Sequence, residues 1–170
     1  VMKMVEMQIR PSQIMTREAL KNTITLLSAI GGSLNALIHL PALAAELGIS
    51  LDWDDFSKIT TTTPVLCSIV PNGNRTVVDL HCAGGIPAVM KELESVMNKD
   101  VLTVTGETLG QILERTPQGD REVIKSMDEP VSRADGIQVL YGNLAPQGAL
   151  VKTSAVPTEV RRFKGTARGI

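Results

Sequence analysis

Aromatic residues are nearly absent from this 170-residue sequence. They make up only 2% of the chain, as Trp53, Phe56, Tyr141 and Phe163. Single-stranded nucleic-acid modules stack bases on aromatic side chains, so this composition argues against them. Lys and Arg number 17 against 18 Asp and Glu, a net charge of −1. Nucleic acid and anionic membranes attract proteins with a surplus of positive charge, so we expect neither as a partner.

Cysteines and long apolar runs are also scarce. Cys67 and Cys82 lack C-x-x-C spacing and suit a reducing compartment, so a cytoplasmic protein is expected. No apolar run approaches the roughly 18–20 residues of a membrane span, because His39 and Pro41 interrupt the longest candidate. Apolar residues still make up 43%, enough for an aliphatic core. The chain has no signal peptide and begins with Val1, which predicts a piece of a longer protein.

Helical periodicity is strongest near the N-terminus. Apolar residues recur on one face from Thr16, a plausible N-cap, to Ile30, and Gly31-Gly32 ends that helix. Ser33 then caps a predicted second helix over residues 34–47. This second helix is apolar nearly all round, which predicts burial, and Pro41 predicts a kink or a restart within it.

The middle of the chain carries shorter signals. Asp52 predicts the cap of a helix, and Pro87 suits the first turn of another. The expected elements are a helix over 53–58, a threonine loop over 60–63, a strand over 65–70, a turn over 71–74, an extended segment over 76–80, and helices over 88–97 and 107–114.

The pattern changes from helical to β after residue 114. A polar stretch with Pro117 and Gly119 predicts a linker, and β-branched runs follow at 123–124, 136–140 and 149–153, the last two joined by a turn over 142–148. We therefore expect an α+β or α/β chain in three parts. These are a mostly helical part over 1–114, a linker over 115–122 and a β-rich part over 123–170.

Gly31-Gly32-Ser33-x-Asn35 is a candidate anion-binding sequence, since it opens a predicted helix with small residues. Free N–H groups and partial positive charge at a helix N-terminus suit a carboxylate or a phosphate. An ordinary turn between two helices, with a serine cap, is the simpler explanation of the same residues. Both interpretations stay open on this motif alone.

Two further clusters carry reactive side chains. Asp79, His81 and Cys82 are metal-ligand types, but a metal site needs three or four ligands, and a partly buried thiol beside a hydrogen-bonded histidine is the simpler interpretation. A Cys–His nucleophile pair is disfavoured because neighbours in an extended segment point to opposite faces. Lys152-Thr153-Ser154 offers a catalytic Lys or Ser, or simply the polar end of a strand.

Longer strings resemble the dihydroxy-acid dehydratase and phosphogluconate dehydratase family along essentially the whole chain. They are Ile9-Arg10-Pro11-Ser12-x-Ile14-Met15-Thr16-Arg17-Glu18-Ala19, Gly31-Gly32-Ser33-Leu34-Asn35-Ala36, Asp79-Leu80-His81-Cys82-Ala83-Gly84-Gly85-Ile86-Pro87, Leu102-Thr103-Val104-Thr105-Gly106-Glu107-Thr108-Leu109, Tyr141-Gly142-Asn143-Leu144-Ala145-Pro146-Gln147-Gly148-Ala149 and Lys152-Thr153-Ser154-Ala155.

The resemblance implies a hydro-lyase that converts a 2,3-dihydroxy acid to a 2-keto acid with an iron–sulfur cluster and magnesium. The string from Asp79 to Pro87 is more similar to the branch that makes branched-chain amino-acid precursors than to the sugar-acid branch. The resemblance places the helical part at the end of the family's N-terminal α/β domain. It places the later strands at the start of a C-terminal β-barrel-like domain. Gly32, Ser33 and Asn35 would then bind substrate.

The sequence also departs from the family pattern. Leu34 stands where the family usually has Thr, and Cys82 where it often has Arg. The family's cluster cysteines, magnesium ligands and catalytic serine belong to motifs outside residues 1–170, so we expect no cofactor or catalytic residue in this segment and no activity from it alone. Uncovered apolar faces would favour self-association, as a two-fold dimer. The alternative is a non-catalytic module, oligomerising or anion-binding, on the same scaffold.

Overall fold

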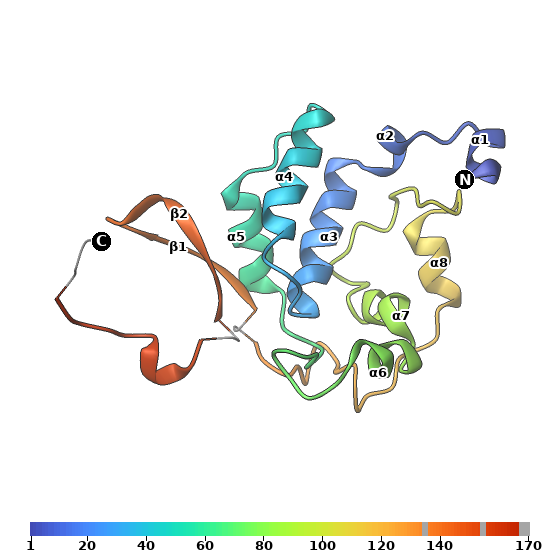
Figure 1. Ribbon diagram of the computed structural model, residues 1–170. Helices are drawn as coiled ribbons and strands as arrows, with labels where there is room; N and C mark the ends of the chain where they lie inside the picture. The colour runs from blue at the N-terminus through green and yellow to red at the C-terminus, as the bar shows by residue number, and fades with distance from the viewer. Residues whose placement is uncertain (134–135, 154–155, 167–170) are drawn as a thin grey trace.

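The computed structural model describes residues 1–133, 136–153 and 156–166, and it has the expected mixed α+β class (Figure 1). Helices fill the first part, and a hairpin follows near the C-terminus. No helix within these residues is long and apolar enough to cross a membrane. The elements are α1 (Met2–Glu6), α2 (Pro11–Ile14), α3 (Arg17–Ala29), α4 (Ala36–Glu46), α5 (Trp53–Thr62), α6 (Val77–Cys82), α7 (Gly85–Glu92), α8 (Leu109–Arg115), β1 (Ile137–Gly142), β2 (Ala145–Lys152) and the 3₁₀ turn η2 (Thr158–Val160).

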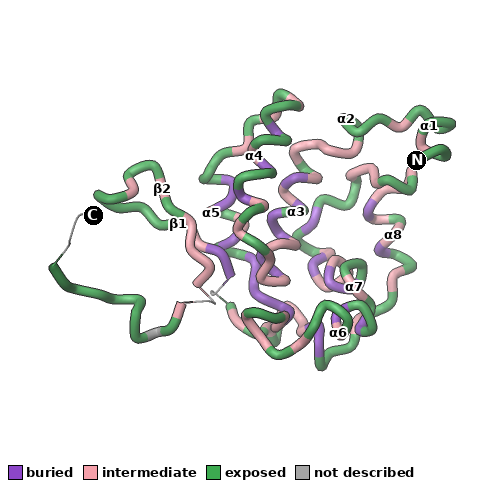
Figure 2. The backbone as a smooth tube through the Cα atoms, viewed as in Figure 1, coloured by how far each residue is buried: buried purple, intermediate pink, exposed green. Residues whose placement is uncertain are grey.

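Two apolar clusters hold these elements together, and in Figure 2 the buried backbone runs through the middle of the helical part. The first core gathers α7 and α8 around Leu66, Leu93 and Leu113. The second core joins α3, α4 and α5 to the first residue of β1, with Ile24, Phe56 and Ile137 at its centre. Aliphatic side chains dominate both cores, as the low aromatic content predicted.

Helix α3 follows the predicted bounds closely. The Thr16 hydroxyl accepts a hydrogen bond from the Ala19 amide at 3.2 Å and so caps the helix. Polar residues on its buried face are satisfied. The Asn22 side chain accepts from the Asn98 amide at 2.8 Å and donates to the Asn98 carbonyl at 2.9 Å. Helix α3 is therefore anchored by polar contacts as well as by its apolar face.

Helix α5 starts where predicted but runs four residues further. Asp52 caps it by accepting from the Asp55 amide at 2.9 Å. The predicted threonine loop over 60–63 is wrong, since residues 60–62 are helical and only Thr63 lies outside the helix. Thr61 and Thr62 each donate their hydroxyl to the carbonyl four residues earlier, which lets threonine stay in a helix despite its modest propensity.

Helix α4 is less buried than its composition predicted. Only Leu37, Leu40 and Ala44 are buried, while Ile38 is 70% exposed and Leu43 43% exposed. The helix packs one side against the second core, and no described element covers the other side. It begins at Ala36 rather than at residue 34, and it continues through Pro41 without a restart.

Residues 76–80 were expected to be extended, and this prediction is wrong. The Thr76 hydroxyl accepts from the Asp79 amide at 3.1 Å, while Asp79 Oδ2 accepts from the Thr76 amide at 2.6 Å. This reciprocal capping box starts helix α6. Helix α7 follows directly, starting at Gly85 after a left-handed Gly84, three residues before the predicted start.

The β-hairpin is tighter than predicted. Gly142 pairs with Ala145, so the strands are joined by a two-residue loop rather than by a turn over 142–148. The earlier extended segment 65–70 makes only isolated bridges, among them Cys67 with Ile124. Helix α5 lies against β1, as Figure 1 also shows, and this contact ties the hairpin to the helical part.

The predicted linker, residues 115–122, packs closely on the helical part. The Asp120 amide donates to the Ala83 carbonyl at 3.0 Å, and Arg121 forms an ion pair with Glu92 at 2.6 Å. Val123 and Ile124, assigned to the β-rich part, are buried in the first core. The division into 1–114 and 123–170 stays a prediction, and in the described residues both sides contribute to one core.

Candidate functional site

An open groove of about 580 Å³ lies between the turn after α3, the loop before α6 and the end of β2. Segments distant in the sequence meet here, because β2 ends beside the glycine turn that follows α3. The walls are almost entirely apolar. The lining residues are Ile30, Gly31, Gly32, Ser33, Leu34, Ile69, Val70, Pro71, Val77, Leu80, Ile86 and Lys152.

The glycine turn at one side of the groove has a defined geometry. Gly31 has φ = +60°, and its amide donates to the Ser28 carbonyl, while the Gly32 amide donates to the Leu27 carbonyl at 2.8 Å. These two bonds form the Schellman motif that ends many helices. A Cβ at Gly32 would collide with the Leu27 side chain. The left-handed backbone favours glycine at position 31, and a larger residue at position 32 would displace the Leu27 side chain.

Ser33 and Asn35 differ in their relation to the groove. Ser33 lines it, and its hydroxyl accepts from the Asn35 amide at 3.2 Å. Asn35 is exposed and is not among the lining residues. Helix α4 starts with amides that donate to the carbonyl three residues earlier, at 3.0–3.3 Å, and without a side-chain cap. Of the predicted substrate-binding residues, the groove thus brings together Gly32 and Ser33.

Lys152, the last residue of β2, enters the groove from the opposite side. Its Nζ donates to the Gly31 carbonyl, which also accepts from Asn72 Nδ2 at 3.3 Å. Among the described residues, no carboxylate forms an ion pair with this ammonium. Burial lowers the pKa of Lys152 below its ordinary value, because the charged form loses water without gaining a negative partner.

The Asp79, His81 and Cys82 cluster does not form a site. Asp79 is occupied as the capping residue of α6, and hydrogen bonds from the Thr76 amide and hydroxyl lower the pKa of its carboxyl. His81 and Cys82 lie on the exposed side of that helix, so the predicted partly buried thiol at Cys82 is wrong. The helix turns Leu80 and Ala83 inward instead.

The described residues do not fit an iron–sulfur cluster or a magnesium ion. No group of three or more His, Cys, Asp or Glu side chains in that part of the chain could hold a metal. Cys67 is buried in the first core, and burial raises the pKa of its thiol to about 11. It is therefore protonated at neutral pH, whereas metal ligation requires the thiolate. Ser154 and Ala155 lie outside the described residues.

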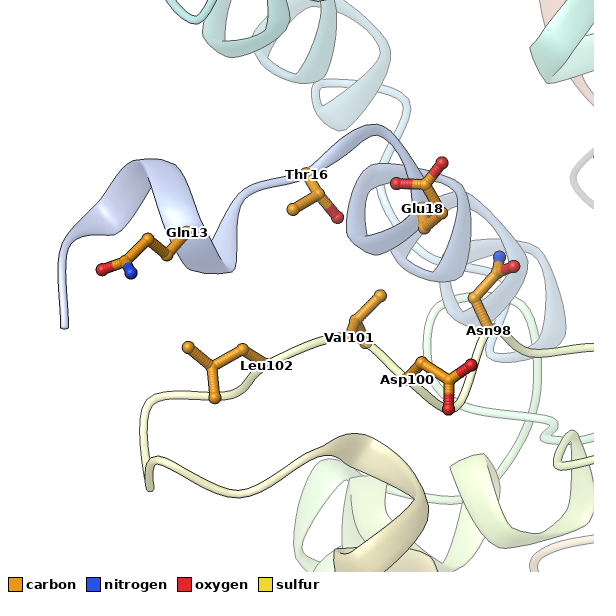
Figure 3. Close-up of a pocket in the computed structure, with 7 residues that line it drawn as sticks. All are labelled: Gln13, Thr16, Glu18, Asn98, Asp100, Val101 and Leu102. Carbon is orange, nitrogen blue, oxygen red and sulfur yellow. The ribbon is translucent and has the colours of Figure 1, made fainter.

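A second hollow, of about 350 Å³, is lined by acidic side chains, whereas the groove is lined by the cation Lys152 (Figure 3). It lies between the start of α3 and the segment before α8. The described residues that line it include the carboxylates of Glu18 and Asp100 but no Lys or Arg. An anionic ligand would be repelled from this hollow. The groove at Lys152 is the better candidate for a carboxylate.

Comparison with known proteins agrees with the family resemblance of the sequence motifs. The family model "Dihydroxy-acid/6-phosphogluconate dehydratase N-terminal" matches residues 1–112, and the corresponding C-terminal model matches residues 122–170. The chain belongs to the dihydroxy-acid/6-phosphogluconate dehydratase family. It is 49% identical over 170 residues to a dihydroxy-acid dehydratase of Ignicoccus hospitalis, and 45% and 44% identical to those of Acetivibrio thermocellus and Caldicellulosiruptor saccharolyticus.

Each of these matches covers 99% of this chain and 31% of the dehydratase relative. The chain thus spans about a third of their length. The departure from the family pattern at Leu34 has a structural counterpart. Leu34 packs against the second core and also lines the groove, so it adds apolar surface at the position where the resemblance implies a threonine.

Most of the residues that line the groove were not predicted from the sequence. Val77, Leu80 and Ile86 line it from α6 and α7, yet residues 76–80 were expected to be extended. The overlooked signal is Thr76-x-x-Asp79, a helix-capping pattern. Lys152 was noticed, but its contact with Gly31 is not visible in the sequence because 121 positions separate the two residues.

Proposed function

We propose that this chain is a segment of a hydro-lyase that converts a 2,3-dihydroxy acid to a 2-keto acid by loss of water. The observation that carries the proposal is the family match across both halves of the chain, at 41–49% identity to proteins named dihydroxy-acid dehydratase. The apolar groove favours a branched aliphatic substrate over a sugar acid, because several sugar hydroxyls would lack hydrogen-bonding side chains there.

The contribution that we assign to this segment is substrate binding. Gly32 and Ser33 present small, polar surface at one side of the groove, and Asn35 follows at the start of α4. The resemblance implies an iron–sulfur cluster and magnesium in the complete enzyme, which would supply Lewis-acid assistance to the departing hydroxyl. The described part of the segment holds no group of three or more side chains that could bind a metal. We expect the segment by itself to be inactive.

The test uses the complete enzyme that contains this segment, loaded with its cluster and magnesium. Formation of 2-keto acid is measured with a branched 2,3-dihydroxy acid and with a six-carbon sugar acid. Ser33→Ala and Asn35→Ala should raise KM or lower kcat for the preferred acid, while Ser95→Ala, an exposed serine outside the groove, should change neither. No 2-keto acid from either substrate would refute the function, and unchanged kinetics in both variants would leave Ser33 and Asn35 as turn residues.

We also propose that the chain self-associates as a two-fold dimer in a cytoplasmic setting. Exposed Ile38 and Leu43 on α4 support association, since burying them removes apolar surface from water. The two free thiols suit a reducing compartment. Light scattering of the 170-residue chain tests the association, and Ile38→Glu should shift the mass toward the monomer. A wild-type monomer at all concentrations would overturn it and would favour the non-catalytic module.

A further inference from the structure

We infer that Lys152 is the residue that binds the carboxylate of the ligand in the groove. This inference rests on the proposed function, which it deepens by naming the charged partner of the acid. Among the described residues that line the groove, Lys152 is the one with a charged side chain, and Ser33 is the one with a hydroxyl. The two sit on separate segments, β2 and the turn after α3, and so flank the same open space.

The ammonium has unused hydrogen-bonding capacity. A lysine Nζ carries three N–H donors, and the described contacts of Lys152 use one of them on the neutral Gly31 carbonyl. Charged groups that are withdrawn from water are normally paired with an opposite charge. Lys152 is half-buried without such a pair among the described residues. A ligand carboxylate would supply the missing negative charge and would accept the remaining N–H bonds.

The rest of the groove suits the other end of such a ligand. Val70 is 56% exposed, Val77 70% and Ile86 37%, and all three line the groove beside the cation. A volume of about 580 Å³ lies within the range of small-molecule sites, roughly 300–1,000 Å³. The chemical class that fits is therefore a short carboxylic acid with a branched alkyl tail.

A purely structural role for Lys152 makes a different prediction. If the side chain served only to hold the glycine turn, its replacement would destabilise the chain but would not alter selectivity between charged and neutral ligands. The discriminating measurement is thus the preference for an acid over its amide, which have the same shape and differ in charge.

The experiment titrates the 170-residue chain with isovalerate and with isovaleramide at neutral pH, followed by NMR. Isovalerate should bind about tenfold more tightly than the amide, the size expected for a charge-assisted hydrogen bond. The acid should shift the amide signals of Gly31, Gly32 and Ser33. Lys152→Met should remove the preference, Lys152→Arg should retain most of it, and Lys58→Met, an exposed lysine outside the groove, should behave as wild type.

Each outcome decides the inference. Equal affinity of the wild type for acid and amide, or acid-induced shifts confined to residues outside the groove, would overturn it. So would a Lys152→Met chain that melts cooperatively and still prefers the acid. If that variant does not fold, the wild-type comparison and Lys152→Arg decide instead. No turnover is measured, so failure of this binding is distinguishable from failure of the proposed dehydration.

Discussion

Helices α3 and α4 follow one another in the chain and have opposite relations between composition and burial. Helix α3 buries polar residues together with apolar ones. Ser28 is as fully buried as Ile24, and the buried Asn22 side chain accepts a hydrogen bond from the Asn98 amide. Helix α4 is almost entirely apolar, yet Ile38 and Leu43 are exposed. Apolar composition therefore predicts which residues would gain from burial, but the neighbouring elements determine which are buried.

The two helices also differ in how their ends and sides are held. Thr16 caps α3, and Arg17 and Lys21 on its first turns form ion pairs with Asp55 of α5 at 2.6 and 3.2 Å. Helix α4 has no side-chain cap, and its described contacts are apolar packing on one side. We expect α3 to be an anchor of the fold and α4 to depend on whatever covers its exposed face.

The largest expected difference concerns one isoleucine in each helix, Ile24 of α3 and Ile38 of α4. Ile24→Ala removes a fully buried side chain from the second core and should lower the free energy of unfolding by about 2–5 kcal/mol. Ile38→Ala at a 70% exposed position should change it by less than about 0.5 kcal/mol. Urea denaturation of both variants measures the contrast. Equal losses would mean that α4 is covered in solution.

The ion pairs between α3 and α5 provide an intermediate effect with a pH signature. Burial raises the pKa of Asp55, but hydrogen bonds and charge from Arg17 and Lys21 outweigh burial and hold the pKa below its ordinary value. Stability from this carboxyl is complete above the unfolded-state pKa, about 3.9, and is lost as the pH falls through the lower folded-state pKa. Asp55→Asn should lower stability by about 1–2 kcal/mol at pH 7.

Acid titration of thermal unfolding tests this assignment. The melting temperature of Asp55→Asn should fall less steeply than that of wild type below the unfolded-state pKa. Asp54→Asn is the matched control, because Asp54 is exposed on the same turn of α5 and makes no described ion pair. Parallel acid limbs for wild type and Asp55→Asn would contradict the proposed role of Asp55.

The smallest effect expected is loss of the α3 cap. Thr16→Ala leaves the Ala19 amide without its acceptor and should lower stability by about 1 kcal/mol. Thr23→Ala, an exposed threonine within the same helix, serves as a control and should stay within about 0.5 kcal/mol of wild type. Chemical denaturation measures both. A Thr16→Ala change no larger than the control would show that the helix start is held by packing alone.

Local signals predicted the starts of several elements. Thr16 and Asp52 cap α3 and α5 as expected, and Gly31-Gly32 ends α3, because caps and glycine turns act within a few residues. Thr76 and Asp79 offered the same kind of helix-capping signal, but Asp79 was considered only as a metal-ligand type and the segment was expected to be extended. The candidate site was predicted only on one side, at Gly32 and Ser33.

The sequence by itself determined the mixed class, the aliphatic cores, the glycine turn and the family to which the chain belongs. Each of these depends on composition or on residues adjacent in the chain. Only the tertiary structure decided that one face of α4 is exposed, that Cys82 faces outward, and that Lys152 reaches the Gly31 carbonyl across 121 positions. Burial and long-range contacts depend on which elements pack together. A local sequence pattern does not show which distant element will pack against it.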